Sequence, residues 1–155
     1  MILVTGGAGF VGSSLALRLR HHFPEQKIVA LDNLKRRGSE LNLPRLRKAG
    51  VDFIHCDIRQ PGDLDFENPD WIIECSAEPS ALSGLDGVTD YLVHTNLLGT
   101  YHCLELARRT GAGMIFLSTS RVYPVKTIRE LRYRTSNSRF ELEEVQEIRG
   151  VSSQG

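Results

Sequence analysis

Three glycines set three residues apart constrain this chain more than any other feature of its sequence. They stand as Gly6-x-x-Gly9-x-x-Gly12 directly after Ile2–Val4, a short and uniformly apolar run that predicts a buried strand. A helical pattern follows from Val11, with apolar residues every three or four positions. The order of strand, glycine turn and helix predicts the first unit of a doubly wound α/β domain.

The glycine turn has the chemistry of a pyrophosphate site. Glycine accepts the positive φ of a tight turn, its missing side chain admits a phosphate, and the following helix offers free N–H groups. Asp32 ends a second apolar run twenty residues after Gly12, where its carboxylate could bind ribose hydroxyls. We predict a dinucleotide site whose turn contacts are Gly6, Gly9, Phe10, Val11 and Gly12. The alternative is a glycine-rich turn in an α/β domain that binds no nucleotide.

Further apolar runs predict the rest of the sheet, at residues 28–31, 51–54, 71–73 and 114–117. A long helical pattern runs from about 89 to 109, whereas 35–50 is basic, split by Pro44 and has only a weak apolar face. Uniformly apolar strands are typical of a parallel sheet covered on both faces. The predicted fold class is therefore α/β, a doubly wound (Rossmann) parallel sheet of about five strands in the order 3-2-1-4-5.

The residues around Asp32 favour NAD over NADP, because a carboxylate there repels the 2′-phosphate. The bases Lys35-Arg36-Arg37 leave NADP open, since an arginine nearby could accept that phosphate. The same bases could also form a solvated loop. Similar dissociation constants for the two cofactors would reverse the choice of NAD.

Composition excludes several classes of protein. Of 155 residues, 41% are hydrophobic, and 19 Lys and Arg balance 19 Asp and Glu, which fits one folded domain and argues against a nucleic-acid binder. No apolar run is long enough to cross a membrane, and the first residues contain neither a basic segment nor a long apolar segment, so we expect no secretory signal. The cysteines Cys56, Cys75 and Cys103 form no metal-ligand pattern, so we expect a reduced, cytoplasmic protein without a metal site.

Five motifs follow the glycine turn in chain order: Asp32-Asn33, Asp57-Ile58, Cys75-Ser76-Ala77-Glu78, Asn96-Leu97-Leu98-Gly99-Thr100 and Ser118-Thr119-Ser120-Arg121-Val122-Tyr123. Together with the segment from Thr5 to Gly12, this series resembles the N-terminal half of an extended short-chain dehydrogenase/reductase of the NAD-dependent epimerase/dehydratase type. The resemblance covers residues 1 to about 124.

The resemblance implies a set of site residues. A Ser or Thr four residues before the motif's tyrosine is catalytic in that family, which designates Thr119. Tyr123 has a structural role in the family pattern. The implied cofactor is NAD, and its implied contacts beyond the glycine turn are Asp32, Asn33, Asp57, Ile58, Cys75, Ser76, Ala77 and Asn96. Asn96 lies within a helical pattern, where asparagine is locally unfavourable, so a polar role such as orienting a water or a loop backbone is expected.

The chemistry of the family also needs a tyrosine followed four residues later by a lysine that lowers its pKa. None of the four tyrosines has a lysine at that spacing. We therefore expect a truncated chain with residues 1–124 as the NAD-binding half and no activity of its own. Residues 125–155 are expected to form a polar hairpin or a poorly ordered tail that leads to a missing C-terminal part.

Within the family the chain looks closest to the CDP-paratose/tyvelose 2-epimerase branch, since dehydratases carry Asp-Glu where Ser120 and Arg121 stand. The implied parent is a nucleotide-sugar epimerase that transfers hydride transiently to bound NAD. Two alternatives remain: a non-catalytic dinucleotide-binding module, and a sugar-nucleotide reductase or dehydrogenase. An S-adenosylmethionine-binding domain is disfavoured by the glycine spacing. The fifth strand is expected to be an unprotected edge of the sheet, which predicts association or aggregation unless residues 125–149 cover that edge; a homo-oligomer is a possible form.

Overall fold

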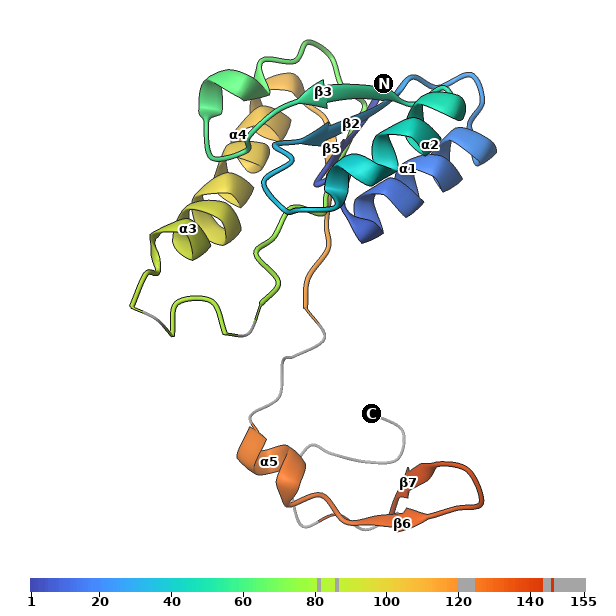
Figure 1. The fold of residues 1–155 in the computed structure, drawn as a ribbon, viewed down its shortest axis with the longest axis vertical. Coiled ribbons are helices and arrows are strands. Elements are labelled where there is room, and N and C mark those ends of the chain that lie inside the picture. Colours follow the sequence, from blue (N-terminus) through green and yellow to red (C-terminus); the bar gives the residue numbers. More distant parts are fainter. Residues whose placement is uncertain (81, 86, 120–124, 144–145, 147–155) are drawn as a thin grey trace. The chain divides into compact units, whose positions relative to one another are not determined.

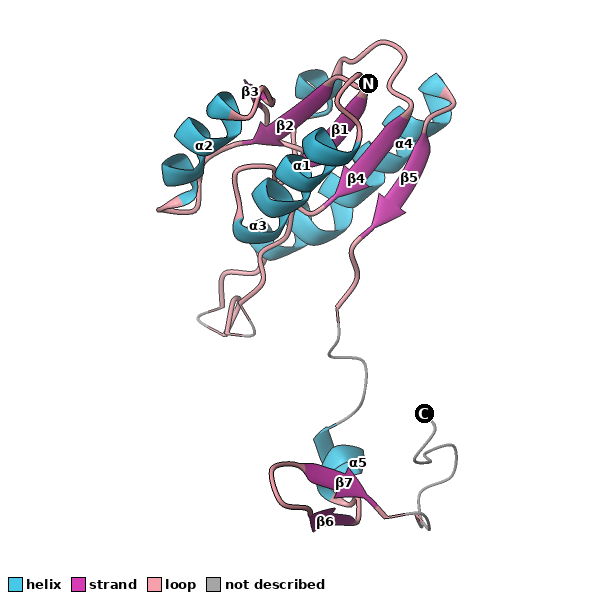
Figure 2. Cartoon of the chain, turned by 90° about the vertical axis from the view of Figure 1, so that its right-hand side faces the viewer, coloured by secondary structure: helices cyan, strands magenta, loops and turns pink. Residues whose placement is uncertain are grey.

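The computed structural model describes residues 1–80, 82–85, 87–119, 125–143 and 146, and the chain divides into two units, 1–117 and 118–155. The first unit, coloured from blue to orange in Figure 1, holds a five-stranded sheet. Its strand order, β3-β2-β1-β4-β5, can be followed in Figure 2. Its strands are β1 (Ile2–Thr5), β2 (Ile28–Asp32), β3 (Asp52–His55), β4 (Trp71–Glu74) and β5 (Gly113–Phe116). The predicted parallel, doubly wound sheet and its strand order are confirmed.

All neighbouring strands of this sheet pair in parallel. The last residue of β1, Thr5, lies opposite Leu31 of β2 and Glu74 of β4. The carboxyl ends of the strands therefore meet at one edge, where open α/β sheets bind their ligands.

Helices cover both faces of the sheet (Figure 2). Helices α1 (Phe10–His22) and α2 (Leu43–Lys48) pack on one face, and α4 (Thr100–Thr110) packs on the other. Alternate residues of β1 point to opposite faces of the sheet. Leu3 belongs to the core cluster under α4, whereas Ile2 and Val4 belong to the cluster under α1 and α2. Burial on both sides explains why β1 and β2 are apolar up to their last residues, Thr5 and Asp32.

Two segments differ from the sequence prediction. The stretch expected to be broken by Pro44 forms a 3₁₀ turn, η1 (Ser39–Asn42), followed directly by α2. Pro44 lies in the first turn of α2, where its missing N–H costs no hydrogen bond. The long predicted helix is also interrupted: α3 (Asp90–Val93) and α4 are joined by a π-helical stretch, η3 (His94–Gly99).

The second unit contains α5 (Val125–Arg129) and an antiparallel pair of strands, β6 (Tyr133–Thr135) and β7 (Phe140–Leu142). The rings of Tyr133 and Phe140 meet edge to face, with centroids 5.2 Å apart.

A further 3₁₀ turn of the first unit, η2 (Pro61–Leu64), follows β3. Among the described residues, no helix has the length and apolar character needed to span a bilayer.

A buried carboxyl group ties the end of β4 to the end of β1. Glu74 is 1% exposed, accepts a hydrogen bond from the Thr5 hydroxyl at 3.3 Å and another from the Ser76 N–H at 2.8 Å. The Thr5 hydroxyl in turn accepts the Cys75 N–H at 3.2 Å. Burial raises the pKa of Glu74, because its charged form is the more costly one to desolvate.

Glu74→Gln should therefore change how stability depends on pH. The pKa of Glu74 is higher in the folded protein than in the unfolded chain. The contribution of Glu74 to the free energy of unfolding is therefore fully present below the unfolded-state pKa, and it is lost as the pH rises through the folded-state pKa. The variant keeps an oxygen acceptor but cannot ionise. Its melting temperature relative to that of the wild type should rise from pH 5 to pH 8 in thermal unfolding. The exposed Glu25→Gln is the matched control, and parallel curves for Glu74→Gln and the wild type would contradict the account.

Candidate functional site

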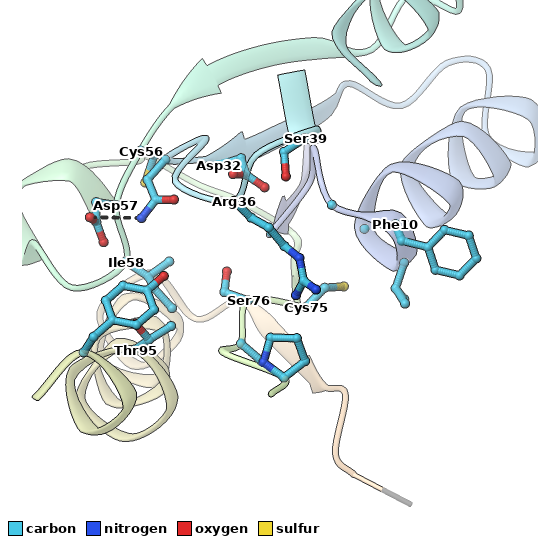
Figure 3. Close-up of a pocket in the computed structure, with 18 residues that line it drawn as sticks. Phe10, Asp32, Arg36, Ser39, Cys56, Asp57, Ile58, Cys75, Ser76 and Thr95 are labelled. Carbon is cyan, nitrogen blue, oxygen red and sulfur yellow. Dashed lines mark hydrogen bonds between the residues drawn. The ribbon is translucent and has the colours of Figure 1, made fainter. Parts of the chain in front are cut away.

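A cavity of about 440 Å³ opens at the carboxyl edge of the sheet (Figure 3). Loops that follow β1, β2, β3 and β4 form it together with the first turn of α1 and residues of α3 and η3. Twelve of the thirteen predicted cofactor contacts line this cavity, namely Gly6, Gly9, Phe10, Val11, Gly12, Asp32, Asn33, Asp57, Ile58, Cys75, Ser76 and Ala77. Four separate motifs of the sequence thus converge on one space.

The glycine turn forms a bare cradle at the start of α1. Gly6 has φ of 59°, and a Cβ atom there would lie 2.8 Å from the Cys75 carbonyl oxygen. A Cβ atom on Gly12 would lie 2.2 Å from the Gly6 carbonyl oxygen. Helix α1 begins after Gly9 with no side-chain cap, so its first N–H groups are available to an anion.

Asp32 connects the glycine turn to the loop after β2. Its carboxylate accepts the Ala8 N–H at 3.1 Å and the Leu34 N–H at 2.8 Å. A carboxylate has about four lone-pair sites, so these two hydrogen bonds leave acceptor capacity toward the cavity that Asp32 lines. The backbone thereby holds the carboxylate in place, which suits it to accept hydrogen bonds from a pair of hydroxyls.

Asp57 is the centre of a polar cluster after β3. It accepts hydrogen bonds from Arg59 Nε at 2.9 Å and from Asn33 Nδ2 at 3.1 Å, the latter drawn in Figure 3. The Arg59 guanidinium lowers the pKa of Asp57 to about 2. The carboxylate therefore stays ionised at neutral pH and acts as a hydrogen-bond acceptor. The adjacent Ile58 is buried and presents an apolar surface to the same cavity.

Tyr91 of α3 was not predicted, yet it lines the cavity and contacts two cations. Lys35 Nζ lies 3.5 Å from its ring centroid, and the Arg59 guanidinium carbon lies 4.9 Å from it. These contacts join the loops after β2 and β3 to α3 by cation–π attraction. Because the three residues are far apart in the chain, only the fold reveals their contact.

Arg36 also lines the cavity without having been assigned to it, although the basic run 35–37 was noted. Its guanidinium extends into the cavity in Figure 3 and has no ion pair with a described residue. The other unpredicted lining residues are Ser39, Cys56, Pro79 and Thr95. Burial raises the pKa of the Cys56 and Cys75 thiols to about 12, so both stay protonated at neutral pH.

Asn96 is the one predicted contact that lies outside the cavity lining. Its side chain accepts the Glu78 N–H at 2.8 Å and donates to the Glu78 carbonyl oxygen at 3.2 Å. The π-helical stretch η3 thus presents Asn96 to the loop that follows β4. Of the two polar roles expected for Asn96, this geometry is that of a residue that orients a loop backbone.

The predicted catalytic residue, Thr119, is exposed and belongs to the second unit, whereas the cavity belongs to the first. The neighbouring motif residues 120–123, including Tyr123, lie outside the described residues. Its catalytic role therefore stays a prediction.

Comparison of the sequence with known protein families identifies the family of this chain. The chain matches the NAD-dependent epimerase/dehydratase family over residues 2–142. It belongs to that family. The resemblance noted from its motifs is thereby confirmed, and the predicted cofactor, NAD, is the one that the family name carries.

Relatives of this family member include enzymes with different reactions. The chain is 32% identical over 125 residues to dTDP-glucose 4,6-dehydratase of Mycobacterium tuberculosis, covering 79% of the chain and 37% of the relative. It is 36% identical over 123 residues to UDP-glucuronic acid decarboxylase 6 of Arabidopsis thaliana, covering 79% and 34%. It is 29% identical over 147 residues to CDP-paratose 2-epimerase of Salmonella typhi, covering 90% and 42%.

Solved structures of similar fold include ADP-L-glycero-D-manno-heptose-6-epimerase of Helicobacter pylori. The TM-score is 0.66 at 31% identity, and the match covers 79% of this chain and 39% of that one. The chain thus spans about 34–42% of the length of the curated relatives described above.

Asn96→Ala should release the loop after β4. Removing both hydrogen bonds to Glu78 leaves its N–H open to solvent, and amide exchange at Glu78 should speed up about tenfold, the effect of roughly 1.4 kcal/mol in local opening. Hydrogen exchange followed by NMR measures this rate. Asn96→Asp retains the acceptor for the Glu78 N–H and should keep most of the protection. Unchanged exchange in Asn96→Ala would show that the side chain does not hold the loop.

Proposed function

We propose that this chain is the NAD-binding portion of a nucleotide-sugar epimerase. The observation that carries the proposal is the convergence of the glycine turn, Asp32 and Asp57 on one cavity at the carboxyl edge of the sheet. The relatives named dehydratase, decarboxylase and epimerase act on nucleotide-linked sugars according to their names, which supports a nucleotide sugar as the substrate of the parent enzyme.

The cavity residues fit NAD. The bare cradle of Gly6, Gly9 and Gly12 admits a pyrophosphate against the N–H groups of α1, with Phe10 and Val11 in the same turn. Asp32, with Asn33 beside it, suits the adenosine ribose, and Asp57 with Ile58 suits the adenine. Cys75, Ser76 and Ala77 line the wall after β4, on the side expected to face the nicotinamide half. When bound, NAD supplies a reversible hydride acceptor.

The reaction class rests on the motifs of the second half of the chain. Thr119 would donate or accept a hydrogen bond at the reacting sugar oxygen, beside a tyrosine–lysine pair that the 155 residues do not contain at the required spacing. We therefore propose that the chain binds NAD but does not epimerise a sugar alone. The absence of that pair equally favours a second candidate, a non-catalytic dinucleotide-binding module.

We also propose a homo-oligomer in the cytoplasm that binds neither nucleic acid nor membrane. The edge strand β5 supports self-association, because Ile115 and Phe116 are exposed and one side of β5 has no neighbouring strand among the described residues. The three cysteines are free thiols, which suits a reducing compartment.

Titration calorimetry with NAD tests the proposed function, with Gly9→Ala as the decisive variant. A Cβ atom there would lie 3.1 Å from the Gly6 carbonyl oxygen and would intrude where the pyrophosphate binds. Loss of charge-assisted N–H contacts should weaken NAD binding by about tenfold or more. Gly62→Ala is the matched control, since its Cβ would meet nothing within 4 Å. Absence of NAD binding to the wild-type chain would refute the proposal.

The same titration should give NAD a dissociation constant at least about tenfold below that of NADP, because the Asp32 carboxylate repels a 2′-phosphate. Asp32→Ala removes the repulsion, so the preference should shrink. Asp65→Ala, an exposed acid that does not line the cavity, should leave the preference unchanged. Equal constants for NAD and NADP in the wild type would contradict this cofactor choice.

A further inference from the structure

An asparagine outside the predicted site holds the glycine turn in place. Asn42, the last residue of η1, donates a hydrogen bond from Nδ2 to the Ala8 carbonyl oxygen at 2.7 Å. Ala8 is buried and lies inside the turn, between Gly7 and Gly9. The two partners are 34 residues apart in the chain, so only the fold brings them together.

This hydrogen bond completes the fixing of the turn's backbone. The Ala8 N–H donates to the Asp32 carboxylate at 3.1 Å, and the Gly9 N–H donates to the Gly6 carbonyl oxygen at 2.9 Å. The Ala8 carbonyl and the Gly9 N–H belong to one planar peptide unit, which Asn42 and Gly6 therefore hold at both ends. Because Gly9 is the N-cap of α1, the orientation of this peptide sets where the free N–H groups of the first helical turn point.

Asn42 makes this contact in place of a local one. It is the N-cap of α2, a position where asparagine usually accepts a hydrogen bond from the backbone of its own helix. Within α2, all of whose residues the structure describes, no such capping bond is present. Pro44, the second residue of α2, has no N–H to donate, and the backbone of Asn42 is helical where an ordinary cap is extended. The amide thus serves a distant turn and not the helix that follows it.

A second hydrogen bond ties the same segment to α1. The Arg45 guanidinium donates to Ser13 Oγ near the start of α1, and Ser13 is fully buried. Both contacts come from residues 39–48, which pack on the same face of the sheet as α1 (Figure 2). The basic stretch 35–50 therefore braces both the glycine turn and the helix that follows the turn.

We propose that Asn42 is a positioning residue that presets the glycine turn for a pyrophosphate. The inference rests on the proposed function and deepens it, because the anion that this turn would receive belongs to the dinucleotide. Asn42 is not among the described residues that line the cavity, so it acts through the Ala8–Gly9 peptide. A turn that is already oriented loses less conformational entropy when it binds a ligand, so the hydrogen bond from Asn42 contributes to affinity.

Asn42→Ala tests the proposal in the full chain, with NAD, ADP and adenosine as probes in NMR titrations. The variant removes the amide without adding charge, so it should weaken NAD and ADP by the same factor, about 3- to 10-fold, as expected for one hydrogen bond. Adenosine has no phosphate, so its affinity should stay within about twofold of that of the wild type. A purely structural role of Asn42 would not produce this difference between the probes. Asn137→Ala, at an exposed position of the second unit, is the matched control and should leave all three dissociation constants unchanged.

A second measurement, on the wild type, decides if Asn42→Ala does not fold or adenosine does not bind. A ligand that requires the preset turn stabilises it in return, so NAD or ADP should slow the exchange of the Asn42 side-chain amide protons with solvent. Exchange rates that are the same with and without these ligands would overturn the inference.

The outcomes separate this inference from the proposed function. If the wild type binds NAD and Asn42→Ala binds it equally well, the inference is overturned while the proposed function stands. If Asn42→Ala weakens adenosine as much as NAD, Asn42 supports the whole cavity, and its assignment to the phosphate cradle is overturned. If the wild type binds neither NAD nor ADP, the proposed function itself fails.

Discussion

The site depends on one close approach of backbone to backbone, between the glycine turn after β1 and the loop after β4. A side chain on Gly6 would lie 2.8 Å from the Cys75 carbonyl oxygen, so the two loops can meet only because Gly6 has none. The buried Thr5–Glu74 hydrogen bond lies just below this contact and joins the same two strands. The cradle at the start of α1 is thereby held against the rest of the cavity before any ligand is bound.

Carboxylates organise the other half of the cavity. Asp32 accepts backbone N–H groups from both the glycine turn and the loop after β2, and Asp57 joins Asn33 to Arg59. Each acid is thus held in position by donors of the protein. Asp32 retains acceptor capacity, whereas Arg59 and Asn33 already occupy the lone-pair sites of Asp57. The side-chain conformational entropy of these acids is already lost when the protein folds. A nucleotide would therefore bind to groups that are already oriented.

Much of this arrangement could be predicted from sequence because it is local or follows from parallel topology. Asp32 ends β2, the glycine turn follows β1 and Asp57 follows β3, and parallel pairing brings these strand ends to one edge. Tyr91 and Thr95 could not be predicted, because their places in the cavity wall depend on how α3 and η3 pack against distant loops. Pro44 misled the prediction because proline breaks a helix interior but is tolerated in a first turn.

An NMR titration of the ¹⁵N-labelled chain with NAD tests the central claim most directly. Each backbone amide reports its own surroundings, so the ligand's position can be mapped without changing a residue. We expect saturable shifts at the N–H groups of Gly9 to Gly12, of Asn33 and of Ile58, while amides at the opposite edge of the sheet, such as Lys27 and Asp70, stay in place. Shifts centred away from the cavity, or no shifts at millimolar NAD, would contradict the account.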